Sequence, residues 1–274
     1  MIIRIGHSPD ADDAFMFWAL QAGLIETPLQ FEHVLRDIQT LNEWAREGRL
    51  ECTALSVHSL AYVADRYAVL MSGGSFGDGY GPILVAREPI PLNELLHYPI
   101  AVPGKLTSAY LALRLFLPNA EVVEMPFDAI MPAVQRGEVA VGLLIHEGQL
   151  THRQHGLVCL LDLGAWWAEQ TGGLPLPLGV NAVRTDLPEA VQREIARVLR
   201  ESIRLGLENR QQALAYALQF GRGIDTPTAD RFVGMYVNAL TLDMGERGRR
   251  AIEEFLRRGA AQGIIPQVSL RYCA

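Results

Sequence analysis

The segment SGGSFGDGYGPILVAR, residues 72–87, separates two regions of the chain that share one pattern. Its five glycines lie between Gly73 and Gly81, and an apolar strand follows them. On each side of the segment, short apolar runs alternate with amphipathic runs that begin at helix-capping residues. Strands that alternate with helices in this way predict βαβ units and a largely parallel sheet in each region.

The glycines of this segment also raise the question of a nucleotide site. The segment lacks the Lys-Ser/Thr ending of a P-loop. It also leads into a strand, whereas a dinucleotide fingerprint leads from a strand into a helix. The sequence therefore disfavours a nucleotide and favours a tightly turned or mobile loop that links the two regions.

After the second region, the pattern indicates that the chain returns to the first. From residue 187 onward it is helical almost to the C-terminus. This order predicts an α/β protein with two lobes, each a mixed sheet flanked by helices, and a ligand cleft between the lobes. We expect residues 1–88 together with 182–274 to form the first lobe, and residues 89–181 to form the second.

The composition argues against several partners and locations. The 274 residues carry a formal net charge of −7, whereas nucleic acid requires clustered Lys and Arg. No apolar run approaches the roughly 18 residues that span a bilayer, and the first residues lack the pattern of a secretory signal. Three widely spaced cysteines, Cys52, Cys159 and Cys273, predict reduced, mostly buried thiols. We therefore expect a cytoplasmic protein that binds neither nucleic acid nor a membrane.

A turn with anion-binding features lies in AVPGKLTSAYLAL, residues 101–113. A strand ends at the Pro-Gly pair, and a helix begins with Thr107 and Ser108. The first turn of a helix has unpaired N–H groups and a partial positive charge, so it holds a carboxylate or a phosphate well. The two hydroxyls add donors, and Lys105 adds charge. The alternative is a plain Thr N-cap that binds no ligand.

Other polar side chains at strand ends are candidates for the wall of the same cleft. Ser56, in LSVHSL, lies where a strand ends and a helix starts, either as a ligand contact or as a helix cap. His7 and Ser8 end the first strand and are placed to line the cleft. The aspartates that follow lack the spacing of a calcium loop. We expect Asp12 or Asp13 to cap the next helix instead.

The candidate base lies in VAVGLLIHEGQL, residues 139–150, where His146 and Glu147 follow the carboxyl end of an apolar strand. An imidazole accepts a proton near neutral pH, and the adjacent Glu147 is placed to orient the ring. The alternative is a ring that hydrogen-bonds only to backbone. A metal site that also uses His152 and His155 is disfavoured, because no carboxylate or thiolate falls at a zinc spacing.

Seven segments, spread over nearly the whole chain, read SPDADDAFMFWAL, VLRDIQTLNEWAREGRL, SGGSFGDGYGPILVAR, IAVPGKLTSAYLAL, GLLIHEGQLT, LDLGAWWAEQTGGLPLPLG and YVNALTLDMGERG. Together they resemble the 1,4-dihydroxy-6-naphthoate synthases of the futalosine route to menaquinone. The resemblance implies a type II periplasmic-binding-protein-like fold in a cytoplasmic enzyme. It also implies a carbon–carbon lyase without a cofactor, which cleaves cyclic dehypoxanthinyl futalosine to 1,4-dihydroxy-6-naphthoate and a three-carbon sugar fragment, dihydroxyacetone.

The same resemblance implies roles for individual residues. The proposed base of the family falls on His146, the substrate-binding hydroxyls after the Pro-Gly pair fall on Thr107 and Ser108, and a further serine falls on Ser56. The N-terminal motif departs from the family. Where the family usually reads S-P-C-P-N-D-T-F, residues 8–15 of this chain read SPDADDAF. The change adds negative charge near a site that is expected to hold a carboxylate.

Two other functions remain open on the sequence alone. One is a solute-binding protein for a small carboxylate anion, which would share the fold but perform no reaction. The other is the chorismate dehydratase of the same pathway, against which the IHEGQLT and GAWWAEQTG segments count. For all three functions we expect a small-molecule carboxylate as the partner, no metal, and a monomer or a homodimer.

Overall fold

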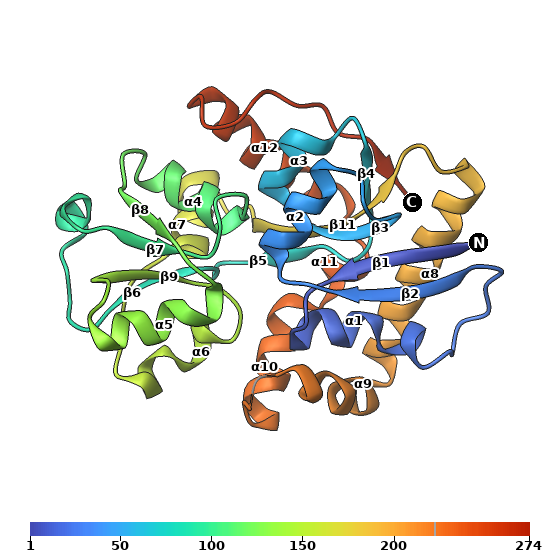
Figure 1. The fold of residues 1–274 in the computed structure, drawn as a ribbon, viewed down its shortest axis with the longest axis horizontal. Helices are drawn as coiled ribbons and strands as arrows, with labels where there is room; N and C mark the ends of the chain where they lie inside the picture. Colours follow the sequence, from blue (N-terminus) through green and yellow to red (C-terminus); the bar gives the residue numbers. More distant parts are fainter. Residues whose placement is uncertain (222) are drawn as a thin grey trace.

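The structure is a computed structural model that describes residues 1–221 and 223–274. The chain folds into two α/β lobes that lie side by side (Figure 1). One lobe contains both ends of the chain, and the other is built from its middle part. Each lobe has a mixed sheet flanked by helices, as the alternation of strands and helices predicts.

The larger sheet belongs to the first lobe, which contains the two termini. Its strand order is β12-β4-β11-β3-β1-β2, and β5 pairs with β11 outside this path. β1 is parallel to β2 and β3, whereas β11 is antiparallel to β3, β4 and β5. The strands are β1 (Ile2–His7), β2 (Gln30–Leu35), β3 (Cys52–Ser56), β4 (Tyr67–Leu70), β5 (Ser75–Gly77), β11 (Leu176–Arg184) and β12 (Tyr272–Cys273).

The smaller sheet forms the second lobe. Its strand order is β10-β6-β9-β7-β8. β7 is parallel to β8 and β9, whereas β6 is antiparallel to β9 and β10. The strands are β6 (Ile83–Ala86), β7 (Ile100–Val102), β8 (Val122–Glu124), β9 (Val141–Leu144) and β10 (Val158–Asp162). The carboxyl ends of β7 and β9 lead directly to the two segments in which the sequence predicts ligand contacts.

Helices cover the faces of both sheets (Figure 1). The C-terminal region is helical as predicted, except that its last residues form β12 at the edge of the larger sheet. The helices of the first lobe are α1 (Ala11–Gln21), α2 (Ile38–Arg46), α3 (Leu60–Val63), α8 (Glu189–Glu208), α9 (Arg210–Ala217), α10 (Thr226–Tyr236), α11 (Ala239–Leu242) and α12 (Gly245–Ala261). Those of the second lobe are α4 (Ser108–Phe116), α5 (Phe127–Arg136), α6 (Gly148–Thr151) and α7 (Leu163–Thr171).

Two strands do not fit the lobe boundaries that the sequence predicts: β6 lies wholly on the other side of one boundary, and β11 spans the other. β6 falls within the predicted first lobe, residues 1–88, but pairs with β9 and β10 of the second sheet. β11 begins within the predicted second lobe, residues 89–181, but pairs with three strands of the first sheet. The apolar pattern locates a strand but does not specify its partner. From the strand pairings, we propose that the chain crosses between the lobes once between β5 and β6 and again between α7 and β11.

Two large hydrophobic clusters stabilise this arrangement. One lies between the first sheet and α1, α8, α9 and α10, and includes Phe15 and Phe232. The other contains residues of both lobes, such as Leu55 of β3 and Ile100 of β7, together with Phe255 of α12. Because burial of apolar surface favours folding roughly in proportion to area, the shared cluster holds the lobes together in addition to the two crossings.

The start of α7 packs closely against the glycine-rich segment. A Cβ atom on Gly164, at the start of α7, would overlap the backbone carbonyl of Tyr80. We expect Gly164→Ala to lower the free energy of unfolding by about 1 to 3 kcal/mol, because a backbone atom cannot move aside as a side chain can. Chemical denaturation measures the change.

A matched variant separates overlap from the loss of a glycine. Gly148→Ala adds a methyl group that meets only the side chain of Leu144, at ordinary van der Waals distance. Its stability should equal or exceed that of the native protein, since Ala favours a helix over Gly. Equal destabilisation by the two variants would contradict the close packing at Gly164.

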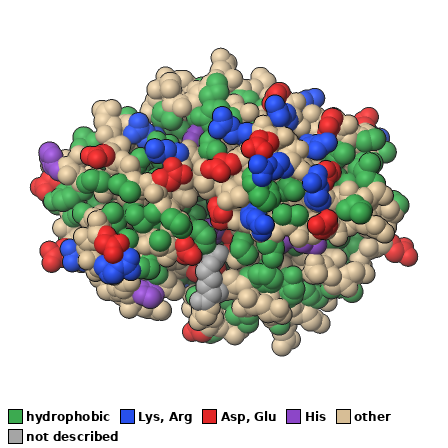
Figure 2. Space-filling view, in the orientation of Figure 1, with side chains coloured by type: hydrophobic (Ala, Val, Ile, Leu, Met, Phe, Trp, Pro, Cys, Tyr) green, Lys and Arg blue, Asp and Glu red, His purple; other side chains and the backbone are tan. Residues whose placement is uncertain are grey.

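The surface charges and the helices bear on the nucleic-acid and membrane partners that the composition argues against, and the cysteines bear on the prediction of buried thiols. On the face drawn in Figure 2, acidic and basic side chains are interspersed. Within residues 1–221 and 223–274, no helix combines the length and the apolar character that crossing a membrane requires.

All three cysteines are free, but only Cys52 is buried, whereas Cys159 is exposed and Cys273 is partly exposed. The expectation of mostly buried thiols is therefore wrong for Cys159.

Candidate active site

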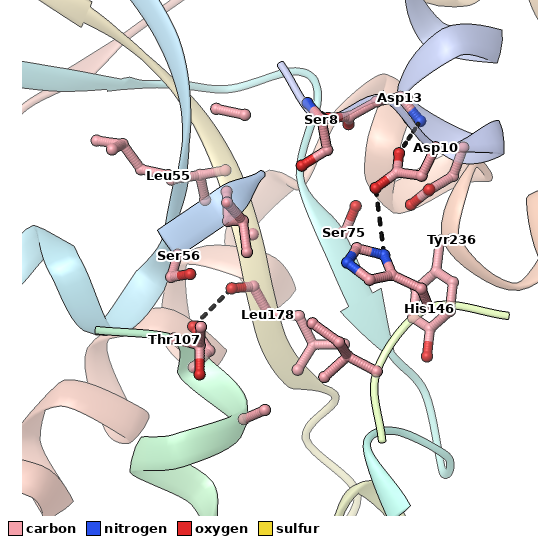
Figure 3. A pocket seen from close by; sticks show the side chains of 18 of the residues that line it. Ser8, Asp10, Asp13, Leu55, Ser56, Ser75, Thr107, His146, Leu178 and Tyr236 are labelled. Carbon is pink, nitrogen blue, oxygen red and sulfur yellow. Dashed lines mark hydrogen bonds and ion pairs between the residues drawn. The ribbon is translucent and has the colours of Figure 1, made fainter. Parts of the chain in front are cut away.

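A cavity lies between the two lobes, where several strands end and helices begin (Figure 3). It encloses about 710 Å³ of space between its atoms, including the part that is open to solvent. Of the predicted site residues, Ser8, Ser56, Thr107, Ser108 and His146 line this cavity. The structure thus brings five residues from four separate segments to one place.

The start of α4 forms one wall of the cavity. Thr107 is the N-cap, as predicted: its hydroxyl accepts a hydrogen bond from the N–H of Tyr110 (3.2 Å) and donates one to the carbonyl of Gly104 (2.8 Å). The Ser108 hydroxyl donates to the carbonyl of Leu178 (2.6 Å). Both hydroxyl protons therefore bond to backbone carbonyls. The donors that α4 offers to a ligand are first-turn N–H groups, such as that of Ala109, which also lines the cavity.

Ser56 lies at the carboxyl end of β3 and is held by Asn42 of α2. The Asn42 side chain donates to the Ser56 hydroxyl oxygen and accepts from the Ser56 N–H, each at 2.9 Å. Ser56 makes no side-chain cap of the short helix that follows, so the cap interpretation is wrong. Because the hydroxyl oxygen accepts the Asn42 bond, its own proton is left to donate into the cavity.

Lys105 differs from the other predicted site residues. It is exposed and lies outside the group of residues that line the cavity. Its backbone N–H approaches the carboxylate of Glu124 (3.4 Å) at the end of β8. The turn directs Thr107 inward, and the long side chain two positions earlier remains in solvent. The structure therefore corrects the prediction that Lys105 helps to form the wall of the site: it lies outside that wall.

His146 follows β9 and reaches into the cavity from the second lobe. Its φ of 56° lies in the left-handed region, which few residues other than glycine adopt. Its ring packs edge-on against Phe127, with 4.7 Å between ring centroids. The Nδ1 atom lies 3.2 Å from Oδ2 of Asp10, on the opposite lobe. The sequence predicts Glu147 as the carboxylate that orients the ring, but the structure brings Asp10 there instead.

In Figure 3, the second nitrogen of the His146 ring faces the side of the cavity where Ser56 and Thr107 lie. The side chain of His146 is 16% exposed, so the ring is reached from the cavity but is largely shielded from bulk water. A neutral imidazole in this position presents one nitrogen to a ligand while Asp10 is next to the other.

Three aspartates at the start of α1 form the end of the cavity that lies opposite the start of α4. Asp10, and not Asp12 or Asp13 as predicted, is the N-cap, and its carboxylate accepts from the Asp13 N–H (3.3 Å). The Asp13 carboxylate accepts from the N–H of Ser8 (2.6 Å). Burial, followed by the neighbouring Asp10, raises the pKa values of Asp12 and Asp13 well above their ordinary range. These two carboxyl groups are therefore more readily neutral than exposed aspartates.

The first strand also places a histidine away from the cavity. His7 stacks on Phe17, with 4.3 Å between ring centroids, and its Nε2 lies 2.9 Å from Nδ1 of His33. Burial lowers the pKa of each of these two histidines to about 4. His7 thus belongs to the packing between β1, β2 and α1, and Ser8 is the residue of this pair that lines the cavity.

The part of the chain that the structure describes bears on the metal site that the sequence disfavours. Among residues 1–221 and 223–274, no three His, Cys, Asp or Glu side chains are grouped so that they could hold a metal ion. His152, one of the histidines considered as a ligand, is buried, and its Nδ1 lies 2.9 Å from the carbonyl of Gln149. The groups that line the cavity include an imidazole, carboxyl groups, hydroxyls and the N–H groups of a helix start, which can take part in proton transfer and anion binding.

Sequence reasoning missed several residues of this site. Asn42 is fully buried in the middle of α2, and a polar residue between Leu41 and Ala45 on the apolar face of that helix was the available signal. Tyr236 of α10 lines the cavity and donates from its hydroxyl to the side chain of Gln149 (2.7 Å). Burial raises the pKa of Tyr236 well above its ordinary range, so it acts as a neutral donor.

Comparison with known proteins supports a common origin over the whole chain. Residues 3–261 match the family model for menaquinone biosynthesis. The chain is 44% identical over 262 residues to a 1,4-dihydroxy-6-naphthoate synthase of Thermus thermophilus, covering 96% of this chain and 95% of the relative. It is 36% identical over 270 residues to the enzyme of that name from Streptomyces coelicolor, with the same coverage.

Solved structures agree with these matches. A protein from Archaeoglobus fulgidus has a TM-score of 0.93 and 48% identity, covering 96% of this chain and 98% of that one. The periplasmic aliphatic sulphonate-binding protein of Escherichia coli has a TM-score of 0.66 at 15% identity, covering 97% and 94%. At that identity the likeness shows the fold alone, and it confirms the predicted periplasmic-binding-protein-like architecture. The chain therefore belongs to the menaquinone biosynthesis family, among the 1,4-dihydroxy-6-naphthoate synthases.

Proposed function

We propose that this protein cleaves cyclic dehypoxanthinyl futalosine to 1,4-dihydroxy-6-naphthoate and dihydroxyacetone, as a step of menaquinone biosynthesis. The position of His146 carries the proposal, because its ring reaches into a cavity between the lobes, opposite the start of α4. The two relatives that bear the name 1,4-dihydroxy-6-naphthoate synthase support it. A passive receptor for an anion does not require a histidine held beside a carboxylate in its cleft.

The carboxylate of the substrate binds at the start of α4 in this proposal. The first-turn N–H groups and the partial positive charge of the helix favour an anion there. The free proton of the Ser56 hydroxyl adds a donor from the other lobe. The Asp10 carboxylate at the start of α1 disfavours a further negative charge at its own end of the cavity. The substrate is thereby oriented with its carboxylate toward α4 and its sugar portion toward His146.

His146 acts as the general base. It removes a hydroxyl proton or an acidic carbon-bound proton from the sugar portion, and the carbon–carbon bond to the three-carbon fragment breaks as the bicyclic ring becomes aromatic. The helix-terminal N–H groups hold the carboxylate fixed through this step. Closure of the lobes around the substrate excludes water from the fragmenting bond.

The proposal also concerns the need for a cofactor, the location of the protein and its oligomeric state. The two products together contain the atoms of the substrate, and neither oxidation nor reduction takes place overall, so the step needs no redox cofactor. A cytoplasmic location and a monomer or homodimer remain predictions.

Incubation with cyclic dehypoxanthinyl futalosine, followed by mass spectrometry, tests the function directly. We expect equal amounts of the naphthoate and the three-carbon fragment. Binding of the substrate without either product would favour the solute-binding protein. Turnover of chorismate in a parallel incubation would favour the dehydratase of the same pathway.

Ser56→Ala should raise KM about tenfold and leave kcat within about twofold, because it removes one hydrogen bond to a charged group. Asn42 keeps a second acceptor in the carbonyl of Leu106 (3.3 Å), so the neighbouring packing is preserved. Steady-state kinetics provide the measurement. Ser59→Ala is the control, because its buried hydroxyl donates to that same carbonyl (3.2 Å) and lies outside the cavity wall. An unchanged KM in Ser56→Ala would contradict the proposed contact.

A further inference from the structure

We propose that Asp10 is the positioning residue for His146, and that it holds the ring from across the cleft between the lobes. The inference rests on the proposed function, in which His146 is the base. Asp10 belongs to the start of α1 in the first lobe, and His146 follows β9 in the second. Their side chains meet with 3.2 Å between Oδ2 of Asp10 and Nδ1 of His146.

The Asp10 carboxylate is held in a single orientation. Its Oδ1 accepts from the N–H of Asp13, and its backbone carbonyl accepts from the N–H of Ala14 (3.0 Å) as α1 begins. The side chain is 3% exposed, so it does not rotate into solvent. With one oxygen bound to its own helix, the other is directed at the imidazole. The acceptor is therefore placed before substrate arrives.

The neighbouring carboxyl groups are poor substitutes for Asp10. Asp13 directs its Oδ2 at the N–H of Ser8, away from the ring. Burial and the charge of Asp10 raise the pKa values of both Asp12 and Asp13, so these groups tend to be neutral. A neutral carboxyl group is a weaker acceptor for the Nδ1 proton than a carboxylate is, and it has no negative charge with which to stabilise a protonated ring. Asp10 is the carboxylate that the structure places against His146.

The chemical consequence concerns the tautomer of the ring. A carboxylate next to Nδ1 favours the form in which that nitrogen bears the proton, and it leaves the lone pair on Nε2. Nε2 faces the part of the cavity assigned to substrate (Figure 3). When Nε2 accepts a proton, Asp10 stabilises the positive charge that forms. Asp10 thus acts through His146 and does not itself touch the substrate.

The two partners come from different lobes, so the pair exists only when the lobes are together. If the lobes separate, the ring loses its carboxylate and either tautomer becomes available. Orientation of the base is thereby linked to closure of the cleft.

The variant Asp10→Ser tests the inference. Serine still caps α1, but its short side chain does not reach His146. We expect kcat on cyclic dehypoxanthinyl futalosine to fall about 10- to 100-fold, with KM changed by less than about threefold. In native protein, ¹⁵N NMR of the imidazole should show the neutral His146 ring protonated on Nδ1. In Asp10→Ser, protonation of Nε2 should increase.

Two further variants complete the test. Asp37→Ser alters the N-cap of α2, which accepts from the Thr40 N–H (3.0 Å) in the same way, and it should leave kcat and the His146 spectrum unchanged. Asp10→Asn keeps the size and the cap but loses the charge, so kcat should fall in it as well if Asp10→Ser does not fold.

Native kcat in Asp10→Ser, or a reduced kcat with an unaltered His146 tautomer, would overturn the inference. A native protein that is inert on the substrate would reject the proposed function instead. The NMR comparison would still test the pair in that case, because it does not require turnover.

Discussion

Replacement of His146 by Asn should lower kcat by about 10²- to 10⁴-fold, the range that loss of a general base produces. Asparagine suits the position because it adopts the left-handed conformation more readily than most residues, and the φ of His146 is 56°. Substrate affinity should change by less than about threefold, since the carboxylate is proposed to bind at the start of α4, away from His146. Single-turnover kinetics and calorimetric titration with substrate measure the two quantities separately.

The variant His97→Asn is the control, because it makes the same change at a histidine that is exposed and lies outside the wall of the cavity. It should retain native kcat. If His146→Asn retained native kcat as well, the base would have to be another group, and the assignment of His146 would be wrong. If both kcat and affinity collapsed with a loss of thermal stability, Phe127 and the turn would have lost their packing, and His146→Gln would then repeat the test.

The second large effect concerns charge at the start of α4. Asp and Asn both cap a helix well, so Thr107→Asp and Thr107→Asn should both retain α4. Thr107→Asp, however, introduces a carboxylate where the substrate carboxylate is proposed to bind. Two like charges about 4 Å apart repel by a few kcal/mol at the effective dielectric constant near a protein surface. We therefore expect the dissociation constant of Thr107→Asp to exceed that of Thr107→Asn by about 100-fold.

The dissociation constant of the product, 1,4-dihydroxy-6-naphthoate, is the measurement for this pair, because it separates binding from turnover. Thermal denaturation should show similar stability for the two variants. Equal affinity in Thr107→Asp and Thr107→Asn would place the carboxylate elsewhere in the cavity and would remove the role proposed for α4.

Much of the fold could be predicted from the sequence because local pattern decides it. Alternating strands and helices specified two α/β regions, and the Pro-Gly turn with Thr107 specified the start of α4. Strand partners depend on contacts between distant residues, which no local pattern carries. For that reason β6 lies in the sheet of the other lobe, and β11 begins before the boundary that was predicted for its lobe.

The residues of the site were likewise predicted where a local pattern decides their position, and missed where contacts between distant residues decide it. His146, Ser56 and Ser8 were found because polar residues at the carboxyl ends of strands tend to meet at one edge of a sheet. Asp10 was not predicted as the partner of His146, because the adjacent Glu147 was the nearer carboxylate in sequence. Lys105 was included on charge alone, and the direction of a long side chain next to a turn is not evident from its charge.

If the proposed reaction takes place in this cavity, the polarity of the cavity determines which product leaves first. One end has the N–H groups of a helix start, and the other has the aspartates of α1. In the proposed reaction, the aromatic acid keeps the negative charge by which α4 is proposed to hold the substrate, whereas the sugar-derived piece is uncharged and has no such anchor. The small neutral molecule is therefore free to leave first, and the departure of the aromatic acid resets the protein for its next cycle.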